Sequence, residues 1–241
     1  MRVQTFSGRN QIATEAIRLL SAGAVKPGVV NVIDAFKRET ARAVKVAFAT
    51  APEISRRINA NEADLIIAPP RVIDEWVKAG KAAQNDRITI GSVGIGVVVR
   101  AGAAFPRIAT VDDFKQSALR AESLVYNQAS TGLYLEDLFA RLGIAQDLEA
   151  KITRYPDAAS VLSHVANGSR NEMGLAATTV IVEAASRGLE FAGPLPGSIQ
   201  NYTAYEATLV RNHAASEQAR ELLRYLGSPR AKEMFKTAGI E

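Results

Sequence analysis

Short apolar segments alternate with amphipathic segments of helical length along most of the chain, and this alternation limits the possible folds more than any other feature of the sequence. In the first part of the chain, the apolar segments are 17–20, 43–50 and 63–70, and the helical segments that follow them are 28–40, 52–61 and 71–82. Within 28–40 the apolar residues recur at intervals of three and four, so they share one helix face. This strand–helix rhythm predicts an α/β fold with a mainly parallel sheet flanked by helices.

A long strand-like segment, 87–102, interrupts the alternation and contains Gly91, Gly94 and Gly96. Glycine within a strand indicates a bend or a close backbone approach, and we interpret this segment as leaving one lobe and entering a second. The second series has expected helices at 110–120, 130–144, 157–168 and 178–188 and expected strands at 122–127, 151–156 and 171–177. Residues 189–210 end in a strand and predict a return crossing, which two closing helices follow within 216–239.

This order predicts two lobes, the first of which is built from both ends of the chain. We assign residues 1–98 and 203–241 to the first lobe and residues 99–202 to the second, which is inserted into it. Two chain crossings between lobes form a hinge. The carboxyl ends of the strands then meet at a cleft between the lobes, where ligands bind in open α/β sheets.

The composition excludes several classes of function. The 241 residues contain no cysteine, and the two histidines, His164 and His213, are far apart, so we expect neither a metal site nor a cofactor. His164 lies within a predicted helix and is expected to be structural. The net charge is +4, but the basic residues are scattered and form no stripe with interleaved aromatics, which argues against nucleic-acid binding.

The ends and the hydropathy of the chain bear on its location. Residues 1–16 lack the apolar core of a secretory signal. No segment approaches the roughly 18 uncharged apolar residues that a membrane span needs. The sequence as written therefore predicts a soluble protein without membrane insertion, which either is cytoplasmic or has lost a leader.

Four turns rich in small residues follow expected strands and precede expected helices. They are 21–28, 49–53, 127–132 and 176–179, and their hydroxyl groups belong to Ser21, Thr50, Ser130, Thr131 and Thr179. Any one of these turns is explained as a helix cap. Four of them at equivalent places favour an uncharged cage of hydroxyl and backbone N–H donors around a small anion.

Basic side chains flank these turns, and most are expected on solvated helix faces: Lys26, Arg56, Arg57, Arg71 and Arg154. Arg154 is the one that we expect in the cleft, because it stands at a strand end and arginine binds a carboxylate through two parallel hydrogen bonds. Tyr202 and Tyr205 lie in the return crossing, where they either line the cleft or pack the hinge.

From residue 17 to the end, the chain resembles the type 2 periplasmic binding proteins of the molybdate-binding kind. The resemblance is carried, in order and spacing, by IRLLSAGAVKPG, VKVAFATAPE, ADLIIAPP, YNQASTG and the closing YLGSPRAKEMFKTAGI. It implies a two-lobed fold in which each lobe has a mainly parallel sheet flanked by helices. It also implies capture of an oxyanion such as molybdate or tungstate in the cleft, delivery to an ABC permease and a periplasmic location, and we expect a monomer.

The resemblance places the family's anion contacts near Ala24, Thr50, Thr131, Asp157 or Ala158, and Ala177. Alanines here replace a family serine near Ala24 and a family tyrosine near Ala177, while Lys26 and Arg154 add positive charge. These departures favour a small carboxylate over molybdate. The full set of predicted ligand-binding residues is Ser21, Ala22, Ala24, Lys26, Thr50, Ala51, Pro69, Ser130, Thr131, Gly132, Arg154, Asp157, Ala177, Thr179 and Tyr202.

A branch of the same fold that contains aconitate isomerase is also similar, through SAGAVKPG, TAP, APP, NQASTG, TRYPD and QNYT. That resemblance implies an alternative function, proton transfer on a tricarboxylate. Such an enzyme needs a general base, and the sequence offers Asp157, Glu206, Tyr202 or Lys26 without distinguishing among them. A third hypothesis, a cytoplasmic ligand sensor, rests only on the missing leader.

Overall fold

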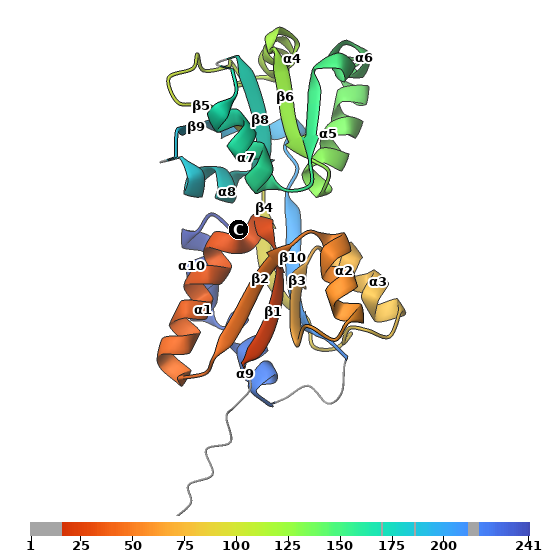
Figure 1. The fold of residues 1–241 in the computed structure, drawn as a ribbon, viewed down its shortest axis with the longest axis vertical. Helices are drawn as coiled ribbons and strands as arrows, with labels where there is room; N and C mark the ends of the chain where they lie inside the picture. Colours follow the sequence, from red (N-terminus) through yellow and green to blue (C-terminus); the bar gives the residue numbers. More distant parts are fainter. Residues whose placement is uncertain (1–15, 170, 186, 212–216) are drawn as a thin grey trace, which may run out of the picture.

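The computed structural model describes residues 16–169, 171–185, 187–211 and 217–241. Two five-stranded sheets lie in two lobes stacked along the long axis of the molecule (Figure 1). The mixed α/β, two-lobed architecture that the sequence predicts is confirmed. Residues 1–15 and His213 lie outside the described residues.

The first sheet has the strand order β2-β1-β3-β10-β4. Its strands are β1 (Ile17–Ala22), β2 (Val44–Ala49), β3 (Leu65–Ala68), β4 (Ile88–Val93) and β10 (Thr203–Leu209). β1 pairs in parallel with β2 and β3, whereas β10 is antiparallel to β3 and β4. The helices of this lobe are α1 (Lys26–Thr40), α2 (Ala51–Asn59), α3 (Pro70–Lys78), α9 (Glu217–Leu226) and α10 (Pro229–Thr237), with a 3₁₀ turn, η1 (Gly23–Val25), before α1.

Alternating side chains of the first sheet bury two separate apolar clusters. Leu19 of β1 packs in a cluster with α1, α9 and α10, while the next residue, Leu20, packs in a cluster with α2 and α3. This follows from the two-residue period of a strand, which sends neighbouring side chains to opposite faces. Both faces of the sheet are therefore covered by helices.

The second sheet has the order β7-β6-β8-β5-β9. Its strands are β5 (Ile95–Arg100), β6 (Ser123–Asn127), β7 (Ile152–Tyr155), β8 (Glu172–Ala177) and β9 (Leu189–Pro194). β6 is parallel to β7 and β8, and β5 is antiparallel to β8 and β9. Its helices are α4 (Val111–Arg120), α5 (Ser130–Arg141), α6 (Ala145–Leu148), α7 (Ala158–Asn167) and α8 (Thr178–Ala184), with 3₁₀ turns η2 (Glu149–Lys151) and η3 (Gly197–Ile199).

The segment expected as one long strand is two strands in two different sheets. β4 ends at Val93, β5 begins at Ile95, and Gly94 between them is the first crossing. A Cβ atom at Gly94 would lie 3.2 Å from the Tyr202 ring, which belongs to the return crossing. The two crossings therefore touch, and the glycine permits their close approach. The lobe boundaries that we assigned, 1–98 with 203–241 and 99–202, remain a proposal.

The side-chain amide of Gln200 joins the two crossings. Its Oε1 accepts a hydrogen bond from Ile95 N at 2.8 Å, and its Nε2 donates to Ile95 O at 2.9 Å. The same Oε1 also accepts from Asn201 N at 2.9 Å. One amide thus satisfies both backbone groups of the residue that opens the second sheet.

The lobes also contact each other on either side of these crossings. Thr179 of α8 donates to Ala24 O of η1 at 2.5 Å, and Lys26 pairs with Glu183 of α8 at 3.6 Å. Tyr205 of β10, 4% exposed, shares a hydrogen bond with Ser130, the first residue of α5. These contacts bring η1, α8 and the start of α5 to the same level of the molecule.

Replacing Gln200 tests whether the hydrogen bonds of its side-chain amide with Ile95 stabilise the two crossings. Gln200→Ala leaves Ile95 N without its partner in a partly buried place, so we expect a loss of about 1–3 kcal/mol in the free energy of unfolding. Urea denaturation followed by circular dichroism measures it. Gln146→Ala on the exposed surface of α6 is the control. An equal change in the free energy of unfolding of both variants would contradict this role of Gln200.

Because of Tyr205, the free energy of unfolding should decrease at high pH. Burial raises the pKa of Tyr205 to about 12, and the hydrogen bond with Ser130 offsets only part of this. Because a tyrosine in an unfolded chain ionises near pH 10, the stability that this group contributes is complete below about pH 10. It is lost as the pH rises through about 12, by roughly 2–3 kcal/mol. Denaturation at a series of pH values from about 9 to 12 should give a steeper loss for the natural protein than for Tyr205→Phe, and parallel curves would refute the assignment.

Candidate functional site

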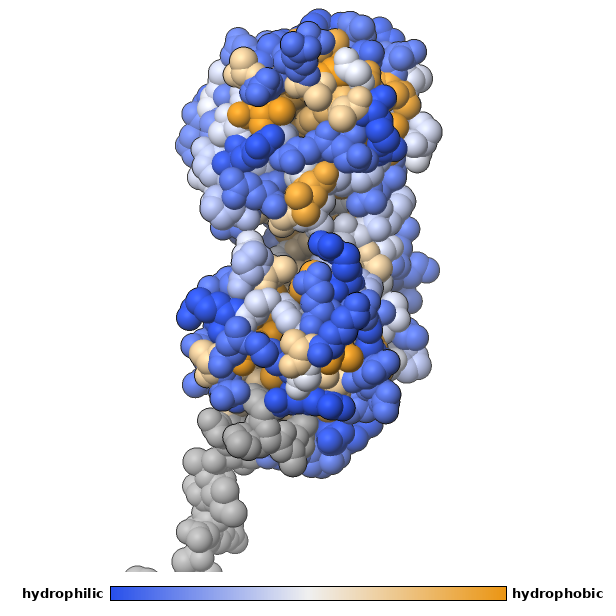
Figure 2. Space-filling view, turned by 90° about the vertical axis from the view of Figure 1, so that its right-hand side faces the viewer, coloured by the Kyte–Doolittle hydropathy of each residue, from blue (hydrophilic) through white to orange (hydrophobic). Residues whose placement is uncertain are grey.

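Several helices begin at the level where the lobes meet. η1 with α1 follows β1, α2 follows β2, α5 follows β6, and α8 follows β8, each with no more than two residues between strand and helix. The contacts of Ser130 with Tyr205 and of Thr179 with Ala24 place the starts of α5 and α8 against the first lobe. Figure 2 shows the surface narrowed and hollowed between the two lobes. This hollow is the candidate site, and we call it the cleft.

The hydroxyl groups at the cleft do not all remain available to a ligand. A hydroxyl has one hydrogen to donate. Ser21 donates to Ala22 O at 3.1 Å, and Thr179 donates to Ala24 O. Ser130 is engaged with Tyr205, which belongs to the other lobe. All three hydroxyls are therefore engaged within the protein, and those of Thr179 and Ser130 join the two lobes.

Thr50 and Thr131 differ from the other three, because the described residues give neither hydroxyl a hydrogen-bond partner. Thr50 precedes α2 at the N-cap position but makes no side-chain capping bond, and Ala51 follows it. Thr131 lies in the first turn of α5 and is only 7% exposed. A hydroxyl that has no protein partner but still reaches solvent can donate to a bound group, so Thr131, on a nearly buried residue, is the stronger indication of a ligand.

Gly132 lets the first turn of α5 lie directly against the end of β6. A Cβ atom at this position would be 1.8 Å from the Asn127 carbonyl oxygen. No larger residue fits without moving α5. Gly132 therefore acts through backbone placement, which sets where the N–H groups of Ser130 and Thr131 lie.

The helix N-termini at the sheet ends differ in how well they suit an anion. Asp157 accepts from Ser160 N at 2.8 Å and so places its own carboxylate at the start of α7. α3 begins with Pro69 and Pro70, which have no N–H to offer. α5 has no acidic residue in its first turn and no side-chain cap. Free N–H groups and partial positive charge therefore remain at the start of α5.

The basic residues near the turns are largely engaged by acidic ones. Arg154 pairs with Glu136 of α5 at 3.0 Å, and its Nε lies 3.4 Å from the Tyr126 hydroxyl, so its guanidinium is directed within the second lobe. Lys26 is bound to Glu183. Arg56 and Arg57 pair with Glu53 and Glu62, while Arg71 is exposed at the start of α3.

None of the four candidate bases has the environment of a catalytic base. Glu206 contacts Arg87 at 2.5–2.6 Å, and Arg87 also contacts Asp74. Burial alone would lower the pKa of Arg87, but hydrogen bonds with Asp74 and Glu206 outweigh burial and raise it. Asp157 caps α7 and Lys26 is ion-paired, whereas Tyr202 is 59% exposed beside Gly94.

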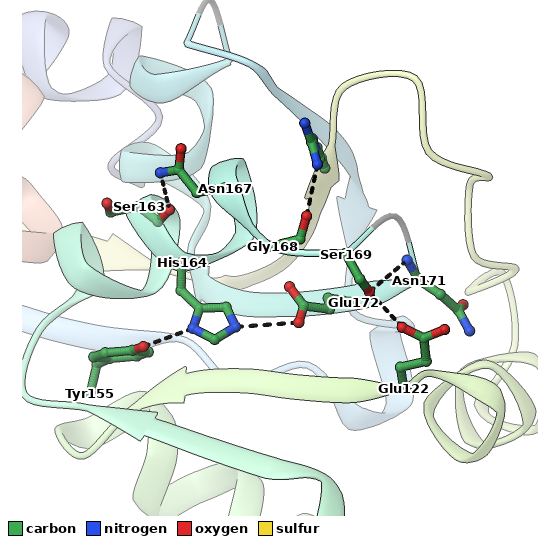
Figure 3. Close-up of polar contacts among 10 residues, drawn as sticks. Glu122, Tyr155, Ser163, His164, Asn167, Gly168, Ser169, Asn171 and Glu172 are labelled. Atoms are coloured by element: carbon green, nitrogen blue, oxygen red, sulfur yellow. Dashed lines mark hydrogen bonds and ion pairs between the residues drawn. The ribbon is translucent and has the colours of Figure 1, made fainter.

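His164 lies inside the second lobe, as part of a polar chain shown in Figure 3. Its Nδ1 is 2.7 Å from the Tyr155 hydroxyl, and its Nε2 is 3.3 Å from Glu172 Oε1. The ring links α7 to β7 and β8, which agrees with a structural role. Across the part of the chain that the structure describes, no group of three or more His, Cys, Asp or Glu side chains is placed to hold a metal ion.

Two alanines of the predicted set, Ala177 and Ala22, are N-cap residues, and Ala177 also joins the two lobes. Ala177 is the N-cap of α8 and packs with the apolar cluster of the first lobe, and Ala22 is the N-cap of η1. One residue near the cleft was missed by the sequence prediction: Asn127, the last residue of β6, is 7% exposed. The turn YNQASTG contains it, but its burial is a tertiary property that the sequence does not reveal.

The chain is similar to known proteins in sequence. A model of the bacterial extracellular solute-binding protein family matches residues 17–241. An aconitate isomerase from Pseudomonas sp is 30% identical over 234 residues, which cover 93% of this chain and 87% of that protein.

Solved structures agree on the fold. The periplasmic molybdate-binding protein of Azotobacter vinelandii superimposes with a TM-score of 0.75 at 17% identity, covering 93% of this chain and 98% of that chain. The tungstate ABC transporter structure from Geobacter sulfurreducens gives 0.71 at 13% identity, covering 92% and 98%. With the family model spanning both lobes, the chain belongs to the bacterial extracellular solute-binding proteins.

Proposed function

We propose that this protein binds a small organic anion bearing carboxylate groups in the cleft between its lobes. The observation that carries the proposal is the start of α5, where the unpartnered hydroxyl of the nearly buried Thr131 accompanies N–H groups without a side-chain cap, and where the first turn has no acidic side chain. Such an arrangement attracts an ionised oxygen. The solute-binding family to which the chain belongs supports the same function.

A carboxylate is preferred over molybdate for two reasons. Alanine stands at residues 24 and 177, where the molybdate-binding resemblance expects a serine and a tyrosine, so two hydroxyl donors are missing. The identity to the aconitate isomerase is 30%, whereas it is 17% to the molybdate-binding protein. An acid with several carboxylates also has more oxygens than a tetrahedral anion to reach donors on both lobes.

The cellular setting belongs to the same proposal. We place the protein in the periplasm as a monomer that passes its ligand to an ABC permease. The family description and the ABC transporter among the structural neighbours support this setting. No helix among the described residues is long and apolar enough to cross a membrane.

Calorimetric titration tests the binding proposal. We expect citrate, cis-aconitate or trans-aconitate to bind the natural protein more tightly than molybdate, tungstate or sulfate. Gly132→Ala should weaken that binding at least about tenfold, because the displaced first turn of α5 loses its charge-assisted hydrogen bonds. Gly197→Ala is the matched control, since a Cβ atom there meets nothing within 4 Å. Absence of heat with citrate, cis-aconitate and trans-aconitate would overturn the proposal.

The 30% identity to an aconitate isomerase favours one second candidate, isomerisation of aconitate. We expect binding without turnover, because Glu206, Asp157 and Lys26 are engaged and Tyr202 is exposed. Proton NMR of cis-aconitate incubated with the protein at high concentration separates the two functions. Formation of trans-aconitate above the rate without protein would establish the enzyme, and its absence would exclude it.

A further inference from the structure

We propose that Asn127 is a specificity-determining residue, whose side-chain amide donates a hydrogen bond to an ionised oxygen of the ligand beside the Thr131 hydroxyl. This inference rests on the proposed function and adds a contact that the sequence prediction did not include. Asn127 ends β6 and Thr131 lies in the first turn of α5, on either side of the two residues that join these elements. Ser130 of the same turn contacts Tyr205 of the first lobe, so the turn lies at the cleft.

The orientation of the Asn127 amide is fixed by its own turn. Asn127 Oδ1 accepts a hydrogen bond from Ala129 N at 2.9 Å. Ala129 is the N-cap of α5, so the side chain lies over the start of that helix. With the oxygen held in this way, the Nδ2 group points away from Ala129 and can act only as a donor.

The Nδ2 group makes no hydrogen bond within the described part of the protein. Asn127 is 7% exposed, and the described residues provide Nδ2 with no hydrogen-bond partner. Nor is the atom sealed from solvent, since the side-chain atoms described that are both sealed and unpaired are Ser123 Oγ and Glu172 Oε2. A nearly buried amide donor that still reaches solvent fits a group that faces the cleft.

The surroundings of Asn127 favour a negatively charged group of a ligand. Two neutral donors, Asn127 Nδ2 and Thr131 Oγ1, stand at a helix start that has no acidic residue in its first turn. The start of α7 is already occupied by the Asp157 carboxylate, and the first turn of α2 contains Glu53. The ligand group that fits the start of α5 accepts at least two hydrogen bonds, as the paired oxygens of a carboxylate or of a tetrahedral oxyanion do.

Asn127→Asp is the decisive variant because it keeps the acceptor that orders the turn and replaces only the donor with a charged oxygen. At pH 7.5 we expect the variant to bind citrate or trans-aconitate about 10- to 100-fold more weakly than the natural protein. The same loss for molybdate or tungstate would identify an oxyanion as the ligand and would equally support the contact. Thr131→Val, which removes the hydroxyl at constant shape, should give a loss of similar size.

Asn171→Asp is the matched control, since it makes the same change at an exposed position before β8, at the end of that strand away from the cleft. Its affinity should stay within about twofold of the natural protein, as expected for a screened surface charge. Urea unfolding of each variant shows whether the fold is retained. If Asn127→Asp binds as well as the natural protein, this inference is wrong and the proposed function stands. If the natural protein binds none of these anions, both fail.

Discussion

Helices of both lobes start at the cleft, so their partial positive charges lie close together there. Several nearby residues compensate for this charge. Parallel strands followed at once by helices leave no alternative, because each helix then starts at the carboxyl edge of its sheet. At other strand ends the protein supplies its own counter-charge or lacks the donors, as with Asp157 at α7 and the prolines at α3. The starts of α5 and α8 have neither feature, and they differ in their hydroxyls: Thr179 of α8 donates to Ala24 O, whereas Thr131 of α5 has no partner among the described residues.

The connection between the lobes is built from backbone groups more than from side-chain packing. Gln200 holds Ile95 through its N–H and its C=O, and Thr178 N of α8 bonds Gly94 O at 3.0 Å. The first contact requires the side-chain amide of Gln200, whereas the second joins two backbone groups and does not depend on a side chain. The polar contacts that join η1 and α8 are few, one hydroxyl to a carbonyl and one ion pair with exposed members. An exposed pair contributes little to stability, so this side of the interface rests mainly on the Thr179 bond and on the packing of Ala177 and Val180 against the apolar cluster of the first lobe.

The order of helices and strands was predictable because it is local. The apolar periodicity of 28–40 and the cap at Thr110, whose hydroxyl accepts from Asp113 N at 3.1 Å, are properties of neighbouring residues. The strand break at Gly94 was missed because a glycine-rich apolar segment has the same sequence pattern whether it forms one strand or two strands in different sheets. Which hydroxyls remain free could not be predicted either: Thr179 and Thr131 look equivalent in sequence, and only the partner Ala24, 155 residues away, separates them. Arg154 of β7 likewise pairs with Glu136 because α5 packs against the sheet that contains β7, which no spacing rule encodes.

Ser130 and Thr131 are adjacent in the first turn of α5, but their side chains have different roles. The side chain of Ser130 bonds Tyr205 of the opposite lobe, while that of Thr131 is left open. Their α-carbons are separated by one peptide unit, about 3.8 Å. A ligand bound at Thr131 would therefore lie one residue away from the contact between Ser130 and Tyr205 that joins the two lobes.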